Sequence, residues 1–281
     1  MLTAIEVDSP RSQETLRLPL EESFELGERL NYFIRDMTGL DPVSAEISKT
    51  NLSGIDGVYI QHTRVGVRNI VFTLGMNPDY ETTTIKTLRD QLYLYFMPQS
   101  PVTLRFMDTE YSSVSIEGVV EELTFPLFTS KPVASISILC PDPHFTSLDD
   151  IVHDFNTTAQ SNREEILYNG SSSGGFQLAM NPKMTLGTTQ YLLSVQGTIG
   201  PAQEFRFGTE INNGEMLWLD TRPGHRRLYL QSGSVTRNLL HTINLGSKWP
   251  LLQPGLNYLR FYAVMTSKPY RISYKEMFGG L

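Results

Sequence analysis

The sequence has little cysteine, little charge and no long apolar run. Its single cysteine, Cys140, cannot form an internal disulfide. One cysteine and five scattered histidines offer no cluster with the ligand spacing of a zinc site. We therefore expect no disulfide framework, no metal and no cofactor.

No segment has the features of a signal peptide or a membrane span. The first residues lack a positive start followed by an apolar core, and no later apolar run is long enough to cross a bilayer. We therefore expect a chain that is made in the cytoplasm and does not insert into membranes. The Asn-x-Ser/Thr matches at Asn51, Asn156 and Asn169 are then interpreted as chance occurrences.

Positive charge is also scarce. The formal net charge is −7 and the isoelectric point is near 5.3. A protein that holds nucleic acid by neutralising its phosphates needs a basic face. The charge balance therefore argues against stable nucleic-acid binding.

Aromatic and turn-forming residues are plentiful by comparison. Tyr and Phe together number 27 and Gly and Pro 37, whereas charged residues make up 19% of the chain, a balance that favours strands and turns. The length of 281 residues allows one large or two ordinary domains, and 40% hydrophobic residues suffice for buried cores. The composition thus predicts a mainly β protein.

The region 46–145 combines strand-like segments with one helix. Alternation is clearest in residues 101–108, and a helical spacing of apolar residues runs through 81–96, from Ile85 to Tyr95 or Phe96, before Pro98 stops it. We interpret this apolar stripe as packing against the neighbouring sheet. The other strand-like segments are 68–75, 113–123 and 132–139.

Cys140 closes the last of these strands, in the run ASISILCPDPHF at 134–145. It continues the apolar row of Ala134, Ile136 and Ile138, so we interpret it as buried and unreactive rather than as a nucleophile paired with His144. Prolines lack a backbone donor, so the Pro-Asp-Pro that follows must end the strand. The sequence therefore predicts a first domain over 1–147 and a polar connector over 148–165.

Strand-like segments resume at Ile166, separated by turns such as INNGE, TRPGH and QPGLN. Many short strands at regular spacing predict a second domain over 166–281, an all-β sandwich. These segments are 166–170, 174–180, 190–197, 204–208, 215–220, 226–233 and 257–265.

No motif marks a catalytic site. The Gly/Ser run at 169–175 lacks the Gly-Lys-Ser/Thr of a P-loop and leads into a strand, so we interpret it as a loop. Neighbours on a strand point to opposite faces, so the adjacent acidic pairs make poor glycosidase sites, and no Gly-x-Ser-x-Gly is present. We expect a non-enzymatic protein without catalytic, cofactor-binding or metal-binding residues. The acidic pairs are Glu121-Glu122, Asp149-Asp150 and Glu164-Glu165.

Two features leave ligand binding open. The RPGHRR cluster at 222–227 is locally basic and could hold a small anion or an acidic partner, although a hairpin turn with solvated charges explains it too. Trp218 and Trp249 could form a platform for sugar rings, although Trp218 alternates with Leu217 and Leu219 as a core strand would. A carbohydrate-binding sandwich is therefore the alternative to a structural role.

Several stretches, taken in order, resemble the distal tail protein family of long-tailed bacteriophages. In the first domain they are DMTGLDPV at 36–43, DG at 56–57, RNIV at 68–71, the helix end LYLYFMP and the CPDPHF junction. In the second they are LYNG at 167–170, GEMLWLDT at 214–221 with Pro-Gly shortly after, and LQPGLN at 252–257. The resemblance spans nearly the whole chain and rests on the order and spacing of these pieces.

The resemblance implies a tail-tube-like β domain with one α-helix, which assembles into a homohexameric ring, and a galectin-like β-sandwich outside it. It also implies a structural protein of the virion, a baseplate hub at the distal end of the tail. Such a hub joins the tail tube protein to the tail-tip or tail-associated hub protein and offers sites to receptor-binding proteins for host attachment. DNA passes through the channel of the ring without binding, which the acidic balance fits.

Overall fold

The computed structural model describes residues 2–20, 31–51, 53, 54, 56–79, 81, 83–108, 113–126, 132–157, 163–182, 184–263 and 268–281. The chain divides into two compact units, Met1–Leu148 with Gly279–Leu281 and Asp149–Phe278. The described residues form 21 strands and one α-helix, which confirms the mainly β fold class. None of their helices is long and apolar enough to cross a membrane.

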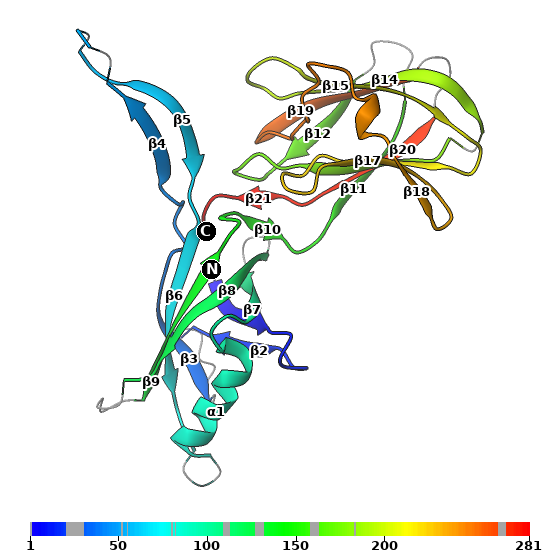
Figure 1. The fold of residues 1–281 in the computed structure, drawn as a ribbon. Helices are drawn as coiled ribbons and strands as arrows, with labels where there is room; N and C mark the ends of the chain where they lie inside the picture. Colours follow the sequence, from blue (N-terminus) through cyan, green and yellow to red (C-terminus); the bar gives the residue numbers. More distant parts are fainter. Residues whose placement is uncertain are drawn as a thin grey trace. The chain divides into compact units, whose positions relative to one another are not determined.

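The first unit is built on one antiparallel sheet with the strand order β2-β1-β7-β8-β9-β6-β3 (Figure 1). All four strand-like segments expected between 46 and 145 are confirmed, with ends shifted by a few residues. The strands are β1 (Leu2–Asp8), β2 (Leu16–Pro19), β3 (Tyr32–Thr38), β6 (Arg68–Met76), β7 (Pro101–Asp108), β8 (Val114–Thr124) and β9 (Val133–Cys140), and β10 (Phe145–Ser147) pairs with β8.

The first 45 residues contribute strands that the sequence pattern did not predict. Strand β1 lies between β2 and β7, and its Ala4, Ile5 and Val7 side chains are buried. Its register against β7 shifts between Leu2 and Ala4, which interrupts simple alternation. Pairing with a strand about a hundred residues later in the chain is therefore what places β1 in the sheet.

Helix α1 (Ile85–Phe96) lies against this sheet, as predicted. The Thr84 hydroxyl caps it by accepting a hydrogen bond from the Thr87 backbone N–H at 3.2 Å. Leu88, Leu92, Tyr95 and Phe96 are its buried residues, and the Phe96 ring meets Phe72 of β6 edge-on at 5.6 Å between centroids. The helix begins later than Glu81 because the Thr83 N–H closes a turn onto the Asp79 carbonyl.

A two-stranded hairpin stands apart from the main sheet of the first unit. Strands β4 (Ala45–Thr50) and β5 (Tyr59–Val65) pair only with each other, and the hairpin lies at the end of the unit away from α1 (Figure 1). Every residue of β5 is exposed. The hairpin therefore adds nothing to the core of its own unit.

The second unit is a sandwich of two antiparallel sheets, which confirms the predicted β-sandwich. The inner faces share one hydrophobic core, in which Phe176, Leu178, Phe205 and Phe207 are fully buried. One sheet has the order β11-β20-β13-β16-β17-β18 and the other β12-β19-β14-β15. Their bounds are β11 (Ile151–Asn156), β12 (Glu164–Tyr168), β13 (Phe176–Met180), β14 (Leu186–Gln196), β15 (Gln203–Ile211), β16 (Met216–Asp220), β17 (Arg227–Ser232), β18 (Val235–Asn238), β19 (Gly255–Ala263) and β20 (Pro269–Tyr274). A short β21 (Met277–Phe278) belongs to neither of these two sheets.

Residues 148–165, expected as a polar connector, contain ordered strand. Strand β11 pairs along its whole length with β20, and β12 begins at Glu164. Because β11 is an edge strand with alternating half-buried and exposed residues, its pattern in the sequence is weak. Residues 158–162 of the expected connector lie outside the described residues.

Candidate functional site

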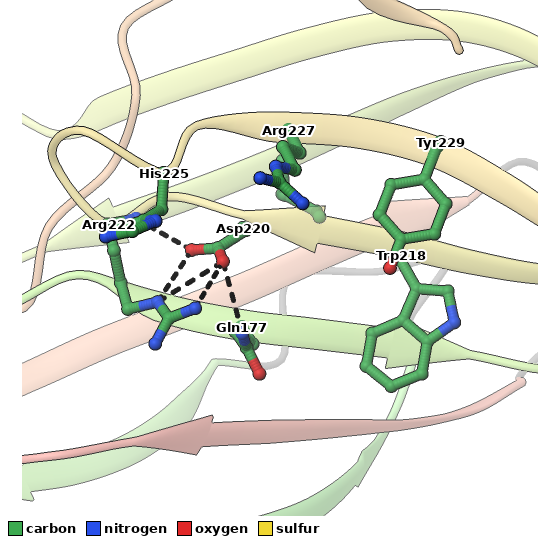
Figure 2. Close-up of a pocket in the computed structure, with 8 residues that line it drawn as sticks. Gln177, Trp218, Asp220, Arg222, His225, Arg227 and Tyr229 are labelled. Atoms are coloured by element: carbon green, nitrogen blue, oxygen red, sulfur yellow. Dashed lines mark hydrogen bonds and ion pairs between the residues drawn. The ribbon is translucent and has the colours of Figure 1, made fainter. Parts of the chain in front are cut away.

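A polar and aromatic pocket lies on the outer face of the six-stranded sheet, over β13, β16 and β17 (Figure 2). Alternation along β16 sends Leu217 and Leu219 into the core and turns Trp218 and Asp220 to the opposite face. Across to β17, Trp218 lies directly opposite Tyr229 and Asp220 lies opposite Arg227. Across to β13, Gln177 lies opposite Asp220.

Asp220 is the centre of the polar half of this pocket. Its carboxylate accepts hydrogen bonds from Arg222 Nε at 3.0 Å and Nη2 at 2.7 Å, from the Arg222 backbone N–H at 3.1 Å, and from Gln177 Nε2 at 3.1 Å. Burial raises the pKa of Asp220, but the hydrogen bonds from Arg222 and Gln177 and the charge of Arg222 outweigh it, so the pKa lies below its ordinary value. The carboxylate is therefore ionised at neutral pH and holds both neighbours in place.

The aromatic half is the cross-strand pair of Trp218 and Tyr229. Their rings are nearly parallel, 14° apart in tilt, with centroids 6.4 Å apart. The indole Nε1 of Trp218 is buried and has no hydrogen-bond partner among the described residues. The pocket has a volume of about 140 Å³ and is lined by Gln177, Trp218, Leu219, Asp220, Arg222, His225, Arg227 and Tyr229.

Arg227 lies between the two halves, as Figure 2 shows. Its side chain shares the outer face with Asp220 and with Tyr229 two residues along the same strand. Within the part of the chain that the structure describes, its guanidinium forms no ion pair or hydrogen bond with another side chain. Asp220 neutralises the positive charge of Arg222, whereas no described residue forms an ion pair with Arg227.

The structure separates the two tryptophans that the sequence offered as a joint sugar platform. Trp218 belongs to a core strand, as its neighbours indicated, but its own side chain faces outward because Leu217 and Leu219 occupy the core side. Trp249 packs half-buried on Phe205, with 4.7 Å between ring centroids. The partners that Trp218 does have, on β13 and β17, could not be recognised in the sequence because strand pairing brings them together.

The arginines of the RPGHRR cluster at 222–227 make different contacts. The cluster forms the turn between β16 and β17, as expected of a hairpin, and its residues are exposed. Arg222 binds Asp220, Arg226 lies over the Trp249 ring at 5.8 Å from its centroid, and Arg227 enters the pocket. Arg222 and Arg227 therefore line the same pocket, and only Arg226 lies outside it.

Cys140 is buried, as its place in the strand predicted. It is fully buried with Ala134, Ile136 and Ile138 on one side of β9, and His144 hydrogen-bonds Asp142 at 2.9 Å. Burial raises the pKa of the Cys140 thiol to about 11, although the charge of Arg68 partly opposes this. A protonated, enclosed thiol cannot act as a nucleophile.

The Gly/Ser run and the acidic pairs, which the sequence analysis also considered as sites, lie in a packed loop and mainly on the surface. The Gly/Ser run forms the loop between β12 and β13, and a Cβ at Gly174 would lie 2.4 Å from the Tyr168 hydroxyl oxygen, so the loop is closely packed and leaves no phosphate cradle. Of the acidic pairs, Glu121-Glu122 and Asp149-Asp150 are exposed, and Glu164 is half-buried beside exposed Glu165. Among the described residues, no group of three or more His, Cys, Asp or Glu side chains could hold a metal ion.

Comparisons with known proteins find similarity to phage tail proteins. Residues 22–140 match the family described as phage tail protein RIFT-related domain. The crystal structure of the Dit protein of phage SPP1, described as a paradigm of the hub adsorption apparatus in phages that infect Gram-positive hosts, is similar with a TM-score of 0.64 and 18% identity. That match covers 88% of this chain and 94% of the SPP1 chain.

A second similar structure is the phage P2 baseplate in its activated conformation with Ca, with a TM-score of 0.47, 11% identity and 98% of each chain covered. No curated protein sequence matches the chain at a significant level. The fold is therefore similar to that of the SPP1 Dit protein, and residues 22–140 match a phage tail domain family.

Proposed function

We propose that this phage tail protein is a structural hub at the distal end of the virion tail. In this proposal the first unit assembles into a homohexameric ring that continues the tail tube and holds the tail-tip proteins, and the galectin-like second unit offers outer sites to receptor-binding proteins. Similarity to the SPP1 Dit protein over nearly the full length of both chains supports the role. The net charge of −7 fits a channel that DNA crosses without binding.

The observation that carries the proposal is the exposed hairpin of β4 and β5. An isolated two-stranded hairpin is marginally stable in water, and this one packs on no other sheet. It nevertheless carries apolar side chains, with Tyr59 62% exposed. Similarly exposed residues on the hairpin and its flanks are Ile47, Val58, Ile60, Val65 and Val67.

A second copy of the chain is the partner that best explains this surface. Contacts between one surface and a different surface of the next copy close into rings when the rotation closes, and such contacts cover exposed apolar residues without leaving an open end. We infer that the hairpin lies against the neighbouring subunit of the ring. Covering its apolar residues would then stabilise both the hairpin and the assembly.

The test is the mass of the purified full chain by light scattering behind a sizing column, with negative-stain images of the same peak. Six copies of the 31.8 kDa chain have a mass of about 191 kDa, and the images should show a ring with an open centre. A monomer at every concentration, alone and with a tail-tube or tail-tip partner added, would contradict the proposal.

A hairpin variant and a matched control sharpen the test. Replacing Tyr59 and Ile60 by Ser should reduce the mass to that of the monomer and leave the β-sheet circular dichroism unchanged, because neither side chain is part of a core. Replacing Ile199 by Ser removes an apolar side chain that is 83% exposed in the second unit and should leave the ring intact. If both variants lost the ring equally, the hairpin would not be the contact that holds the ring together.

A further inference from the structure

We propose that the pocket over β13, β16 and β17 binds one sugar residue that carries an acidic group, of the uronic acid type. This binding role lies beyond the hub role and does not depend on it. Three properties of the pocket carry the inference: an aromatic surface, a fixed set of polar groups and one uncompensated positive charge. Each of them matches a different part of an acidic sugar.

The aromatic surface matches the apolar face of a sugar ring. Trp218 and Tyr229 lie side by side on the outer face of a rigid sheet, and both line the pocket. Trp and Tyr present a flat apolar ring face that can cover the C–H groups of a sugar. A site built on strands also keeps this surface in place before the ligand arrives.

The polar half of the pocket matches ring hydroxyls. Asp220 already accepts five hydrogen bonds, two on Oδ1 and three on Oδ2, with Arg222 Nε shared between the two oxygens, which occupies its lone-pair sites. Its role is therefore to fix Arg222 and Gln177 rather than to contact the ligand. Arg222 keeps N–H donors that Asp220 does not use, and the Gln177 amide oxygen remains as an acceptor, so donor and acceptor stand together in fixed positions.

The charge of Arg227 selects an acidic ligand. Arg222 is neutralised by Asp220, but Arg227 faces the pocket without an ion-pair partner among the described residues. A guanidinium binds a carboxylate through two parallel N–H···O bonds, which gives both energy and orientation.

The size of the pocket limits the ligand to one small ring. Its volume of about 140 Å³ lies below the usual range for drug-sized ligands, which starts near 300 Å³. A nucleic-acid strand fits the pocket less well, because a single free arginine and a chain of net charge −7 cannot neutralise a row of phosphates. The pocket therefore suits a sugar at the end or on a branch of a glycan.

Saturation-transfer NMR with the full chain tests the proposal, because this measurement works for a monomer and for a ring alike. The probe is glucuronic acid, and glucose is the neutral comparison. We expect transfer to glucuronic acid with a Kd of roughly 1 mM, as for a weak single-ring ligand, and at least tenfold weaker binding of glucose. No transfer to glucuronic acid, or equal binding of the two sugars, would overturn the proposal.

Three variants locate the site. Arg227→Gln should weaken glucuronic acid binding about tenfold, and Trp218→Leu should abolish binding of both sugars without unfolding a chain whose core it does not enter. Arg226→Gln removes the same charge one residue away, over Trp249 rather than in the pocket, and should leave binding unchanged. If Arg226→Gln weakened binding as much as Arg227→Gln, the effect would come from the net charge of the protein, and the proposed site would be refuted.

Discussion

The guanidinium of Arg68 lies over the ring of Phe145, with its Cζ atom 4.4 Å from the ring centroid. Both side chains are buried, and Arg68 is only 1% exposed. Its guanidinium also binds backbone carbonyls from three other parts of the first unit. These hydrogen bonds run from Nε to Pro143, from Nη1 to Gly39 and Asp41, and from Nη2 to Gly279.

Replacing Arg68 by Met should strongly destabilise the first unit. The substitution removes a buried guanidinium that donates to four carbonyls, of which those of Gly39, Pro143 and Gly279 belong to half-buried residues and that of Asp41 to an exposed one. A hydrogen bond from a charged donor contributes more than a neutral one, so the loss of four is costly. We expect the free energy of unfolding to fall by about 3 kcal/mol or more, measured by urea denaturation followed by circular dichroism. The control is Arg105→Met, which breaks a half-exposed pair with Asp8 and should cost no more than about 1 kcal/mol. Equal costs would show that Arg68 does not organise these loops.

Gly39 should not tolerate a side chain. Its φ of +90° belongs to the left-handed region, and a Cβ would lie 2.0 Å from the Asn69 carbonyl oxygen. Gly57 has a similar φ of +100° but nothing within 4 Å of a Cβ, so it separates backbone strain from collision. We expect Gly57→Ala to cost about 1 kcal/mol and Gly39→Ala more than about 3 kcal/mol in urea denaturation. Similar costs at the two positions would contradict the close approach of the Gly39 loop to β6.

The acid stability of the second unit should depend on Asp220. Its pKa is lower in the folded chain than the value near 3.9 of an unfolded one, so its contribution is complete above about pH 4 and is lost as the pH falls through the folded pKa. Asp220→Asn should lower the free energy of unfolding at pH 7, and its difference from the natural protein should shrink toward pH 2. The measurement is urea denaturation at a series of pH values. A difference that stays constant with pH would mean that ionisation of Asp220 does not contribute.

Cys140 should resist thiol reagents in the folded protein. Burial raises the pKa of its thiol to about 11, so little thiolate exists at pH 8, and the side chain is fully buried. We expect reaction with a disulfide reagent to be slower than for a free thiol by about a hundredfold or more, and to become fast in denaturant. The first unit must open before the thiol reacts, so Arg68→Met should accelerate the reaction and Asp220→Asn should not. Rapid labelling of the native protein would refute this account.

The stretches that carried the family resemblance prove to be the places where buried polar groups fix turns. In LQPGLN, Asn257 is fully buried and bonds the backbone of Gln253 and Gly255. In GEMLWLDT, the Thr221 hydroxyl both accepts from and donates to the backbone of Phe176. In LYNG, the Tyr168 hydroxyl accepts the Met277 N–H. Such residues maintain a fold, which explains why a pattern of turn-like phrases pointed to the correct architecture.

What the sequence by itself determined is local. Strand-like patterning predicted most of the strands from Arg68 onward but missed β10, β11, β18, β20 and β21. Helical spacing and a threonine cap predicted α1, and the prolines after Cys140 predicted the end of β9, because each of these depends on neighbours along the chain. The same local reasoning correctly predicted that Cys140 is buried and that residues 169–175 form a loop between strands.

The tertiary structure decided what depends on pairing between distant strands. The register of β13, β16 and β17 places Gln177, Asp220 and Arg227 in one row and Trp218 beside Tyr229, although these residues are up to 52 positions apart in the sequence. It also collects four carbonyls around Arg68 and leaves the hairpin of β4 and β5 without a sheet to cover it. A single sequence does not encode strand register in any local pattern, because side chains alternate in the same way whichever partner the strand finds.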